Sequence, residues 1–412
     1  MKILLITGGL NWGGTAQALV GYALILKAKH KVLVWGCKSE GELAGLLRSR
    51  GIAVCIGADA AEQARAFRPD IINFHQPGTF SNAEVISFMR ELRTWRARIV
   101  ETNVFGRPVP EFRGLVDLSI QVSKWDLWQW NRWKGRNYGI PGVYCPNPVD
   151  CDLYKRISDE EIGEVRQSWG IPEWALVVGR IGNTNWETLA TPMQESLERI
   201  KNVHFVIVAD RKCLLPQSLL NHPRVHMVPR LHGASELCRF YSSCDVMVSM
   251  SAIGESFGYV NAEAMACGTP VIALSTPLHC NAQSEVVSPG EGGYTIACPD
   301  LFPDALERFF WKTDRAAMAQ CVRELIVERY SYPVCAKILD GIFIEDLGQL
   351  DGLRDVDAKW IRRLLGGAIG RYGIVQRAVF PFYYSRLGYL LMTFAKTRLA
   401  VFFKLIRKML MQ

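Results

Sequence analysis

The sequence lacks long uncharged apolar runs and any regular arrangement of cysteine. No stretch of 18 apolar residues without a charge occurs in its 412 residues, so we expect no transmembrane helix. The first residues, MKILLITGG, hold one lysine and a short apolar run, which predicts a buried strand and not a signal peptide. The twelve cysteines form no C-x-x-C pair and no His/Cys spacing suited to zinc. We therefore expect reduced thiols and a cytoplasmic protein.

Most of the chain also lacks excess charge. Residues 354–412 hold twelve Lys or Arg against two Asp, a net charge of +10. Because the whole chain carries +8, the first 353 residues carry −2. This nearly neutral body does not support nucleic-acid binding, which depends on basic surfaces.

The distribution of apolar segments predicts two α/β domains. Apolar residues make up 49% of the chain, as in a globular protein, and its length allows two domains with separate cores. Short apolar segments alternate with helical patterns through residue 122, and the same alternation restarts at residue 175. Such alternation is typical of parallel, doubly wound sheets. We expect domains at 1–165 and 166–345, followed by a basic amphipathic helical tail at 346–412.

The most informative stretch is residues 249–270, SMSAIGESFGYVNAEAMACGTP. A strand before it, a small-residue loop and a helix that ends near Gly268 and Pro270 are predicted. The start of such a helix offers free N–H groups and a positive dipole to an anion. With seven residues between them, Glu255 and Glu263 would lie about 12 Å apart on a mostly helical spacer. Carboxylates at that separation can accept hydrogen bonds from a sugar and a ribose on either side of a diphosphate, although two solvated glutamates are the simpler alternative.

The segment ESFGYVNAEAMACGTPVIA resembles the E-x7-E signature of the retaining glycosyltransferases of family GT4. The resemblance implies a GT-B fold, in which two Rossmann-like domains face each other across a cleft that binds a nucleotide-sugar. It further implies that Glu255 orients the donor sugar and that Glu263 holds the ribose. Its motif-specific part runs from Gly179 to Glu285, and the implied phosphate and donor contacts are Ser256, Phe257, Gly258 and Glu285.

In the second half of the chain, Arg180 is placed just past a predicted strand, where an arginine can clamp a diphosphate. The family pattern has a lysine five residues after this arginine, but Asn185 stands here, and Lys201 and Lys212 are too distant in sequence to replace it. The family often has paired glycines before the acid at Glu285, and this chain has Asn-Ala-Gln there. The identity of the donor therefore cannot be carried over from the family.

The first half offers further candidates. Gly13 and Gly14 belong to a glycine-rich turn that does not fit G-x-G-x-x-G, so a nicotinamide dinucleotide is not favoured. The turn resembles the loop that lines the cleft in these glycosyltransferases. His75 follows a strand at the edge where such sheets bind ligands, and it resembles a family histidine, although a loop histidine without a role is the alternative. Asn103 stands where many members have a histidine beside the donor sugar, and an amide cannot titrate near neutral pH.

Two other motifs invite interpretation. Trp125, Trp128, Trp130 and Trp133 could form an aromatic platform for a sugar or lipid acceptor, but packing of their helix against the sheet is favoured. Asp150-Cys151-Asp152 has the form of a D-x-D cation site. We reject that role because the segment is Pro-rich and resembles the interdomain linker of the family. We therefore expect neither a metal nor another cofactor.

The tail mixes basic and large apolar residues at helical spacing. Basic amphipathic helices of this kind lie on anionic membranes, although packing on the body or on a partner subunit would explain the same pattern. We interpret residues 355–412 as a membrane contact on the inner face of the membrane, where an acceptor could be lipid-linked.

The sequence thus predicts a retaining glycosyltransferase that acts on a nucleotide diphosphate sugar and a hydroxyl acceptor, such as a lipid-linked saccharide or a polysaccharide precursor. Catalysis is assigned to Glu255, Arg180 and His75. Two alternatives remain open: a weak or inactive glycosyltransferase-like binding protein, and a nucleotide-sugar epimerase of the same fold.

Overall fold

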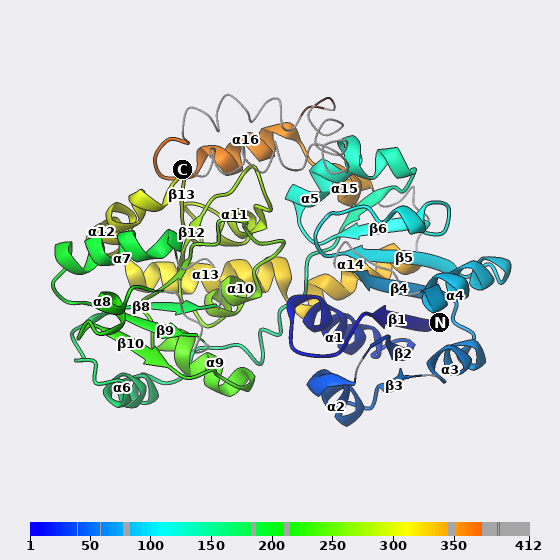
Figure 1. Cartoon of the computed structure of the whole chain (residues 1–412), viewed down its shortest axis with the longest axis horizontal. Coiled ribbons are helices and arrows are strands. Elements are labelled where there is room, and N and C mark those ends of the chain that lie inside the picture. The colour runs from blue at the N-terminus through cyan, green and yellow to red at the C-terminus, as the bar shows by residue number, and fades with distance from the viewer. Residues whose placement is uncertain are drawn as a thin grey trace. The chain divides into compact units, whose positions relative to one another are not determined.

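The computed structural model describes residues 1–38, 40–57, 59–76, 83–182, 187–209, 215–344 and 351–372, together with residues 385 and 387 (Figure 1). Two compact units are present. Unit 1 contains Met1–Pro148 and Tyr330–Asp357, and unit 2 contains Val149–Arg329 and the described residues from Ala358 to Tyr372. The division falls within the Pro-rich segment 145–154, earlier than residue 165, and the chain returns to unit 1 after Arg329.

Unit 1 is built around a seven-stranded parallel sheet in the order β3-β2-β1-β4-β5-β6-β7. Its strands are β1 Lys2–Thr7, β2 Lys31–Gly36, β3 Ala53–Ile56, β4 Ile71–Gln76, β5 Arg98–Asn103, β6 Leu118–Gln121 and β7 Gly142–Tyr144. Its α-helices are α1 Gly14–Leu26, α2 Gly41–Ser49, α3 Ala60–Phe67, α4 Ala83–Thr94, α5 Lys124–Gln129, α14 Tyr332–Ile344 and α15 Asp351–Arg354. Short turns of other helix types are Pro110–Phe112, Trp130–Lys134 and Arg136–Tyr138.

Unit 2 is built around a six-stranded parallel sheet in the order β10-β9-β8-β11-β12-β13. Its strands are β8 Leu176–Ile181, β9 Val203–Val208, β10 Val225–Val228, β11 Val246–Ser249, β12 Val271–Leu274 and β13 Gly293–Ile296. Its α-helices are α6 Asp159–Ser168, α7 Glu187–Arg199, α8 Gln217–Leu220, α9 Gly233–Ser242, α10 Tyr259–Ala266, α11 Ala282–Val287, α12 Phe302–Lys312, α13 Arg315–Tyr330 and α16 Ala358–Gly366. A 3-10 turn at Pro299–Leu301 precedes α12.

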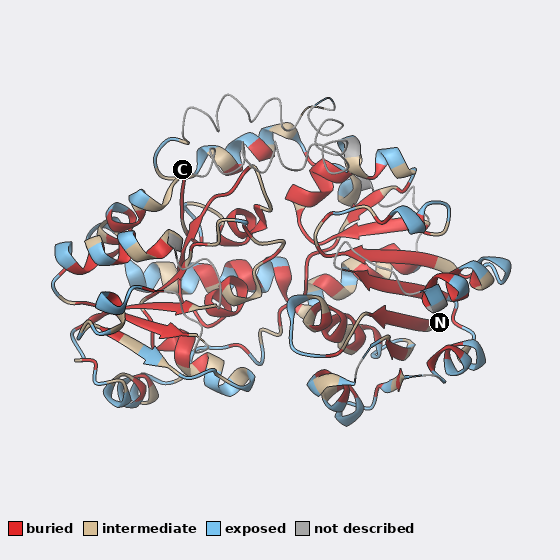
Figure 2. Cartoon of the chain, in the orientation of Figure 1, coloured by how far each residue is buried: buried red, intermediate tan, exposed pale blue. Residues whose placement is uncertain are grey.

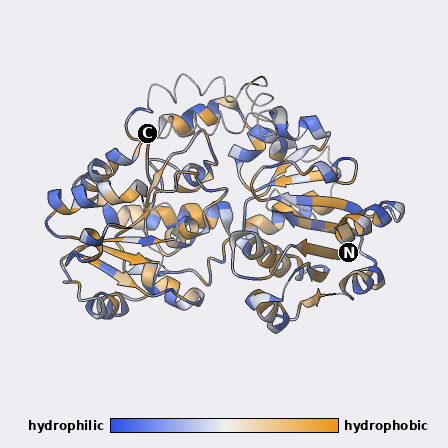
Figure 3. Ribbon diagram, in the orientation of Figure 1, coloured by the Kyte–Doolittle hydropathy of each residue, from blue (hydrophilic) through white to orange (hydrophobic). Residues whose placement is uncertain are grey.

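The apolar runs in the sequence explain both sheets. Strands with helices on both faces are buried on both sides, so they read as nearly continuous apolar segments and not as alternating ones. The central strands are coloured as buried in Figure 2 and as hydrophobic in Figure 3. Local signals set helix starts: at α6, Ser158 and Glu161 form a reciprocal capping box. The predicted fold class, two Rossmann-like parallel-sheet units, is confirmed.

The last described segment belongs to unit 2. On α16, Ile361 and Leu364 are buried while Arg362 and Arg363 are exposed, so this helix packs its apolar face on the unit. Beyond it, Ile369 pairs with β13: its N–H donates to Thr295 O at 2.7 Å and its carbonyl accepts from Ala297 N at 3.1 Å. For the start of the predicted tail, the packing interpretation is therefore the one observed.

Candidate functional site

The ends of three neighbouring strands meet at the carboxyl edge of the sheet in unit 2. The strand β11 lies between β8 and β12, so the ends of these parallel strands are neighbours. The chain after β11 leads into α10, and the chain after β12 leads into α11. Ligands of open α/β sheets bind at this kind of edge. The predicted helix after residue 258, its end at Gly268 and the following strand are all confirmed here.

The backbone of Glu255 is fixed on both sides by the first two residues of α11. Its N–H donates to Oε1 of Gln283 at 2.9 Å, and its carbonyl accepts from the N–H of Ala282 at 3.0 Å. The other end of the Gln283 amide donates to Leu274 O at 2.9 Å and to Oγ1 of Thr276 at 2.7 Å. The loop that carries Glu255 and the loop after β12 therefore form one hydrogen-bonded body.

Glycine is required at two positions around Glu255. Gly254 has φ of 67°, and a Cβ there would lie 1.7 Å from Cys280 O, so only glycine lets the two loops come this close. Gly258 precedes α10 with φ of 88°, a left-handed conformation that a β-carbon disfavours. The chain thereby turns sharply from Glu255 into the first turn of α10, where the N–H groups of Asn261 and Ala262 donate to the carbonyl of Gly258, at 3.1 and 3.2 Å.

Arg180 provides the positive charge beside Glu255. The structure places it within β8 and not just past it, because β8 continues to Ile181. The side chain is nearly buried, with 5% of the residue exposed. Burial raises the pKa of Glu255, and the charge of Arg180 opposes that rise. The two side chains thus form a partly desolvated pair of opposite charges, in which Coulomb interactions are stronger than in water.

Glu263 lies on α10 and is only 4% exposed. Its Oε2 accepts a hydrogen bond from the hydroxyl of Tyr241 at 2.9 Å, and the hydroxyl of Tyr154 also hydrogen-bonds to this carboxylate. Burial and the charge of Glu263 raise the pKa of both tyrosines. Because an ionised carboxylate has about four acceptor positions, the two tyrosines leave some of them for other donors.

The remaining donor-binding candidates of unit 2 surround this loop. Phe257 is buried and its ring lies 5.2 Å from that of Tyr259. Ser256 is half-buried in the turn before α10. Glu285 is buried on α11, two residues after Gln283. The structure thus brings Arg180, Glu255, Glu263 and Glu285 onto adjoining elements of one unit.

In unit 1, the glycine turn is exposed at Gly13 and Gly14, and Gly14 begins α1. The φ of Gly13 is 170°, an extended value that any residue adopts. A Cβ on Gly13 would meet no heavy atom within 4 Å. Neither strain nor crowding within the described chain therefore demands glycine at this position, in contrast to Gly254.

His75 is the fifth residue of β4 and is completely buried. Its ring packs edge-on against Tyr22, with centroids 4.8 Å apart. Neither ring nitrogen has a hydrogen-bond partner among the described residues. Burial lowers the pKa of His75 to about 3, so the imidazole is neutral at physiological pH. In this arrangement His75 contributes an apolar ring surface to the core.

Asn103 ends β5 and holds the loop that follows. Its Nδ2 donates to Arg107 O at 2.9 Å, and its Oδ1 accepts from Arg107 N at 3.0 Å. It also hydrogen-bonds to Glu101, a buried carboxyl that accepts from Ser119 Oγ at 2.5 Å and from Gln76 Nε2 at 3.0 Å. Burial raises the pKa of Glu101 to about 7, although these hydrogen bonds oppose the rise. The polar groups at this edge thus largely satisfy one another.

The tryptophan-rich segment packs as expected. Trp125, Trp128 and Trp130 are buried, and Nε1 of Trp130 donates to Ile140 O at 3.0 Å. The α-helix ends at Gln129 and continues as a wider π-helical turn from Trp130 to Lys134. The side chain of Trp133 lies outside the described part of the structure.

Asp150 acts locally in the linker. Its Oδ1 accepts from the N–H groups of Asp152 and Leu153, at 3.2 and 3.0 Å, which forms a turn. Within the described ranges no group of three or more His, Cys, Asp or Glu side chains is arranged to hold a metal ion. Asn185, Lys212 and residues 373–384, 386 and 388–412 lie outside the described residues, so the predictions made for them stay predictions.

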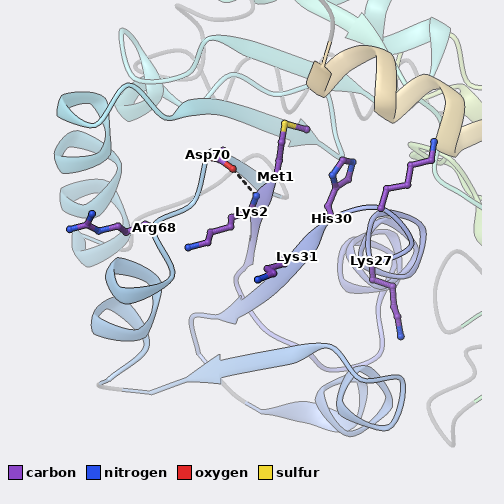
Figure 4. Close-up of a pocket in the computed structure, with 8 residues that line it drawn as sticks. Met1, Lys2, Lys27, His30, Lys31, Arg68 and Asp70 are labelled. Atoms are coloured by element: carbon purple, nitrogen blue, oxygen red, sulfur yellow. Dashed lines mark hydrogen bonds between the residues drawn. The ribbon is translucent and has the colours of Figure 1, made fainter.

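A shallow basic hollow of about 620 Å³ lies at the amino ends of β1, β2 and β4 in unit 1 (Figure 4). In Figure 4 the charged ends of Lys2, Lys27 and Arg68 point in different directions and do not converge. Lys27 follows the end of α1 and Arg68 follows the end of α3, where cations offset the negative end of a helix dipole. We therefore assign no ligand to this hollow.

Sequence reasoning missed Gln283 and Asn281 as residues that organise the site. Asn281 is completely buried, and its Oδ1 accepts from Thr276 N at 2.8 Å and from Ser284 Oγ at 3.0 Å. The sequence did contain a sign of this, because the glycine pair expected from the family is absent at residues 281–283. Where the resemblance predicts a pair of glycines, two amide side chains hydrogen-bond the loop.

Comparison with known proteins agrees with this geometry. Residues 172–310 match the model of the family described as glycosyl transferases group 1. The D-inositol 3-phosphate glycosyltransferase of Corynebacterium jeikeium is 26% identical over 220 residues, 48% of this chain and 51% of that protein. The corresponding protein of Paenarthrobacter aurescens is 39% identical over 79 residues, 19% of this chain and 18% of that protein. The matches thus span about half or less of these curated relatives.

Among solved structures, HepE of Anabaena in complex with UDP-glucose superposes with a TM-score of 0.66 at 18% identity, covering 83% of this chain and 99% of that one. This likeness establishes the architecture, and the family match covers the residues of unit 2 that surround Glu255. Residues 172–310 thus carry the features of a group 1 glycosyltransferase domain, on a chain that has the GT-B fold.

Proposed function

We propose that the protein is a retaining glycosyltransferase that transfers a sugar from a nucleoside diphosphate sugar to a hydroxyl acceptor. The observation that carries this proposal is the fixed backbone of Glu255 beside Arg180, at the start of α10 and within the segment that matches the family model. The intact Glu255 and Glu263 pair, the GT4 signature named above, adds to it.

The residues of unit 2 have distinct roles in this proposal. The carboxylate of Glu255 accepts hydrogen bonds from hydroxyls of the donor sugar. The N–H groups from Ser256 to Gly258 and the positive end of α10 hold the diphosphate. Arg180 offsets the charge that develops on the leaving diphosphate, and remaining acceptor positions of Glu263 hold the ribose. Glu285 lies on the adjoining helix and contacts the donor.

No metal or other cofactor is part of the proposed mechanism. The described part of unit 2 offers no side chain that we assign as a covalent nucleophile. In the proposed retaining reaction, the leaving diphosphate accepts the proton of the acceptor hydroxyl while the new bond forms on the same face of the sugar. In unit 1, the exposed turn at Gly13 and Gly14 leaves room for a ligand. We keep His75 and Asn103 as sequence-based candidates that mutation can test.

A panel of nucleotide sugars tests the reaction. UDP-glucose is included because HepE of Anabaena was solved with it. We expect release of nucleoside diphosphate by the wild type, its loss in Glu255→Ala, and no change in Glu291→Ala, a surface glutamate paired with Arg329. Retention is checked by the anomeric configuration of the product in NMR spectra. Absence of release with every donor would favour a binding protein, and an altered sugar still attached to its nucleotide would favour an epimerase.

We further propose that the acceptor is a lipid-linked saccharide or polysaccharide precursor at an anionic membrane surface on the cytoplasmic side. No helix in the described residues is long and apolar enough to span a bilayer. The support is the net charge of +10 on residues 354–412 and their spacing of apolar and basic residues. Each basic residue near such a surface can add ~1 kcal/mol to binding.

Vesicle sedimentation tests this membrane contact. The wild type should bind vesicles of phosphatidylcholine with phosphatidylglycerol and should bind pure phosphatidylcholine weakly. A chain that ends at Tyr372 removes seven of the twelve basic residues and keeps the segment that packs on unit 2. Equal binding of the shortened chain and the wild type to the anionic vesicles would exclude residues 373–412 as the contact.

A further inference from the structure

The loop that fixes Glu255 is itself held by Tyr372, which lies outside the segment that matches the family model. The hydroxyl of Tyr372 lies 2.8 Å from Oγ of Ser275, the first residue after β12. It also lies 3.3 Å from Leu365 O at the end of α16. Tyr372 therefore joins the carboxyl-terminal segment of unit 2 to the loop between β12 and α11.

From Ser275 the hydrogen bonds continue without a break to Glu255. Ser275 Oγ donates to Oδ1 of Asn281 at 3.3 Å. Oδ1 of Asn281 also accepts from the N–H of Thr276 at 2.8 Å. Thr276 Oγ1 accepts from Gln283 Nε2 at 2.7 Å, and Gln283 Oε1 accepts from the N–H of Glu255 at 2.9 Å.

The side chains along this path are buried, so the loss of any one of these hydrogen bonds costs free energy. Ser275, Asn281 and Gln283 are all exposed by 2% or less. A buried polar group that loses its partner is costly, so the members hold one another in a single arrangement. Asn281 and Gln283 therefore fasten the loop and link it to the residue that contacts Ser275.

We propose that Tyr372 is a positioning residue for glycosyl transfer, which sets the orientation of Glu255 through the loop after β12. The inference rests on the proposed function for its effect on catalysis, and on the hydrogen bonds alone for its effect on the loop. Tyr372 does not touch the donor in this proposal. The pairing of Ile369 with β13 anchors the segment, and the hydroxyl of Tyr372 connects the segment to Ser275.

Tyr372→Phe tests the hydroxyl with little change in packing. Tyr294→Phe is the matched control, because Tyr294 lies on β13 of the same unit and its hydroxyl is 2.6 Å from Oγ1 of Thr313, away from the loop. Amide hydrogen exchange over residues 251–258 measures the loop directly. We expect about three- to tenfold faster exchange of this peptide in Tyr372→Phe, the effect of one net hydrogen bond, and no change in Tyr294→Phe.

Kinetics with the nucleotide sugar measure the effect on catalysis. Because a misplaced carboxylate affects the transition state more than ground-state binding, kcat should fall by about three- to tenfold in Tyr372→Phe while the donor KM stays within about twofold. Gln283→Met removes the bond next to Glu255 and should have a larger effect. In the double variant the two losses should be less than additive, because both act through one path.

Unchanged exchange over residues 251–258 in Tyr372→Phe would overturn the inference, whatever the enzyme does. A fall in kcat that Tyr294→Phe shares would also overturn it, since it would reflect general loosening of unit 2. Strictly additive losses in the double variant would do the same. Faster exchange in a protein whose wild type turns over no nucleotide sugar would overturn the proposed function and support the loop coupling.

Discussion

At the carboxyl edge of the sheet in unit 1, polar side chains hydrogen-bond mainly to one another, whereas in unit 2 they hold the backbone of a loop that presents a charge. Glu101 accepts from Ser119 and Gln76 and is buried. Glu255 is only partly buried, its main chain is held by residues 282 and 283, and its carboxylate faces the charge of Arg180. We therefore expect the ionised groups of the proposed reaction to come from unit 2.

The largest expected effect is at Glu255. Glu255→Gln keeps the volume of the side chain and removes the charge that faces Arg180, so donor turnover should fall by about 100-fold or more. The melting temperature should change little, because the backbone bonds to Gln283 and Ala282 remain. Steady-state release of nucleoside diphosphate measures the loss, and turnover within twofold of the wild type would remove Glu255 from the mechanism.

Gly254→Ala should have the next largest effect, on stability. The added Cβ would overlap Cys280 O and would sit on a backbone with φ of 67°, so we expect a loss of about 3 kcal/mol in the free energy of unfolding of unit 2. Urea denaturation measures it. Gly13→Ala is the comparison in unit 1 and should be nearly neutral for stability, since nothing crowds that position.

His75→Phe tests whether unit 1 uses an imidazole at all. The folded-state pKa of about 3 lies below the unfolded value near 6.5, so the unfolded chain binds more protons between these pH values and stability falls as the pH drops. Phenylalanine does not titrate. Between pH 8 and pH 5 the free energy of unfolding should therefore fall by about 2 kcal/mol less in the variant than in the wild type. Melting curves at pH 5 and 8 measure this difference.

The same variant has a catalytic readout. Because His75 is buried and neutral, we expect turnover to stay within a few-fold of the wild type at pH 8. A loss of two orders of magnitude in a well-folded His75→Phe would show that the sequence-based assignment of His75 to catalysis was right and that the contrast between the units is wrong.

At Glu101 we expect a pH effect on stability that is opposite in sign to that of His75. Its folded-state pKa of about 7 lies above the unfolded value near 4.5, so here the folded state binds the extra proton and stability decreases as the pH rises from 4.5 to 7. Glu101→Gln removes this penalty and should raise stability at pH 8 by about 2.5 kcal/mol relative to its effect at pH 5. If Glu101→Gln changed the free energy of unfolding equally at pH 5 and pH 8, the pKa of Glu101 would not be raised by folding.

The sequence predicted the fold because apolar periodicity and glycine placement act locally. The strand before Ser249, the helix at Tyr259–Ala266 and the role of Gly268 follow from residue types within that stretch. The prediction that Arg180 lies just past its strand was wrong, because pairing with β9 extends β8 to Ile181. The burial of His75 also escaped prediction, since it results from Tyr22 on α1, 53 residues away in sequence.

Contacts between distant segments were the least accessible to sequence reasoning. Gln283 is important because its amide reaches Glu255, and a glutamine in isolation gives no sign of this. Tyr372 reaches Ser275 across 97 positions of sequence. The departure from the glycine pair expected from the family marked the right loop. It predicted only that the identity of the donor cannot be carried over, and it did not predict the hydrogen bonds that Asn281 and Gln283 make there.

The pairing of Ile369 with β13 has a consequence for solubility. In the order of the second sheet β13 is the last strand, so without residue 369 its outer N–H and C=O groups would form an open edge. Open edges recruit strands from other molecules and promote aggregation. Chains shortened before Ile369 should therefore self-associate through β13, while chains that end at Tyr372 should remain monodisperse in light scattering.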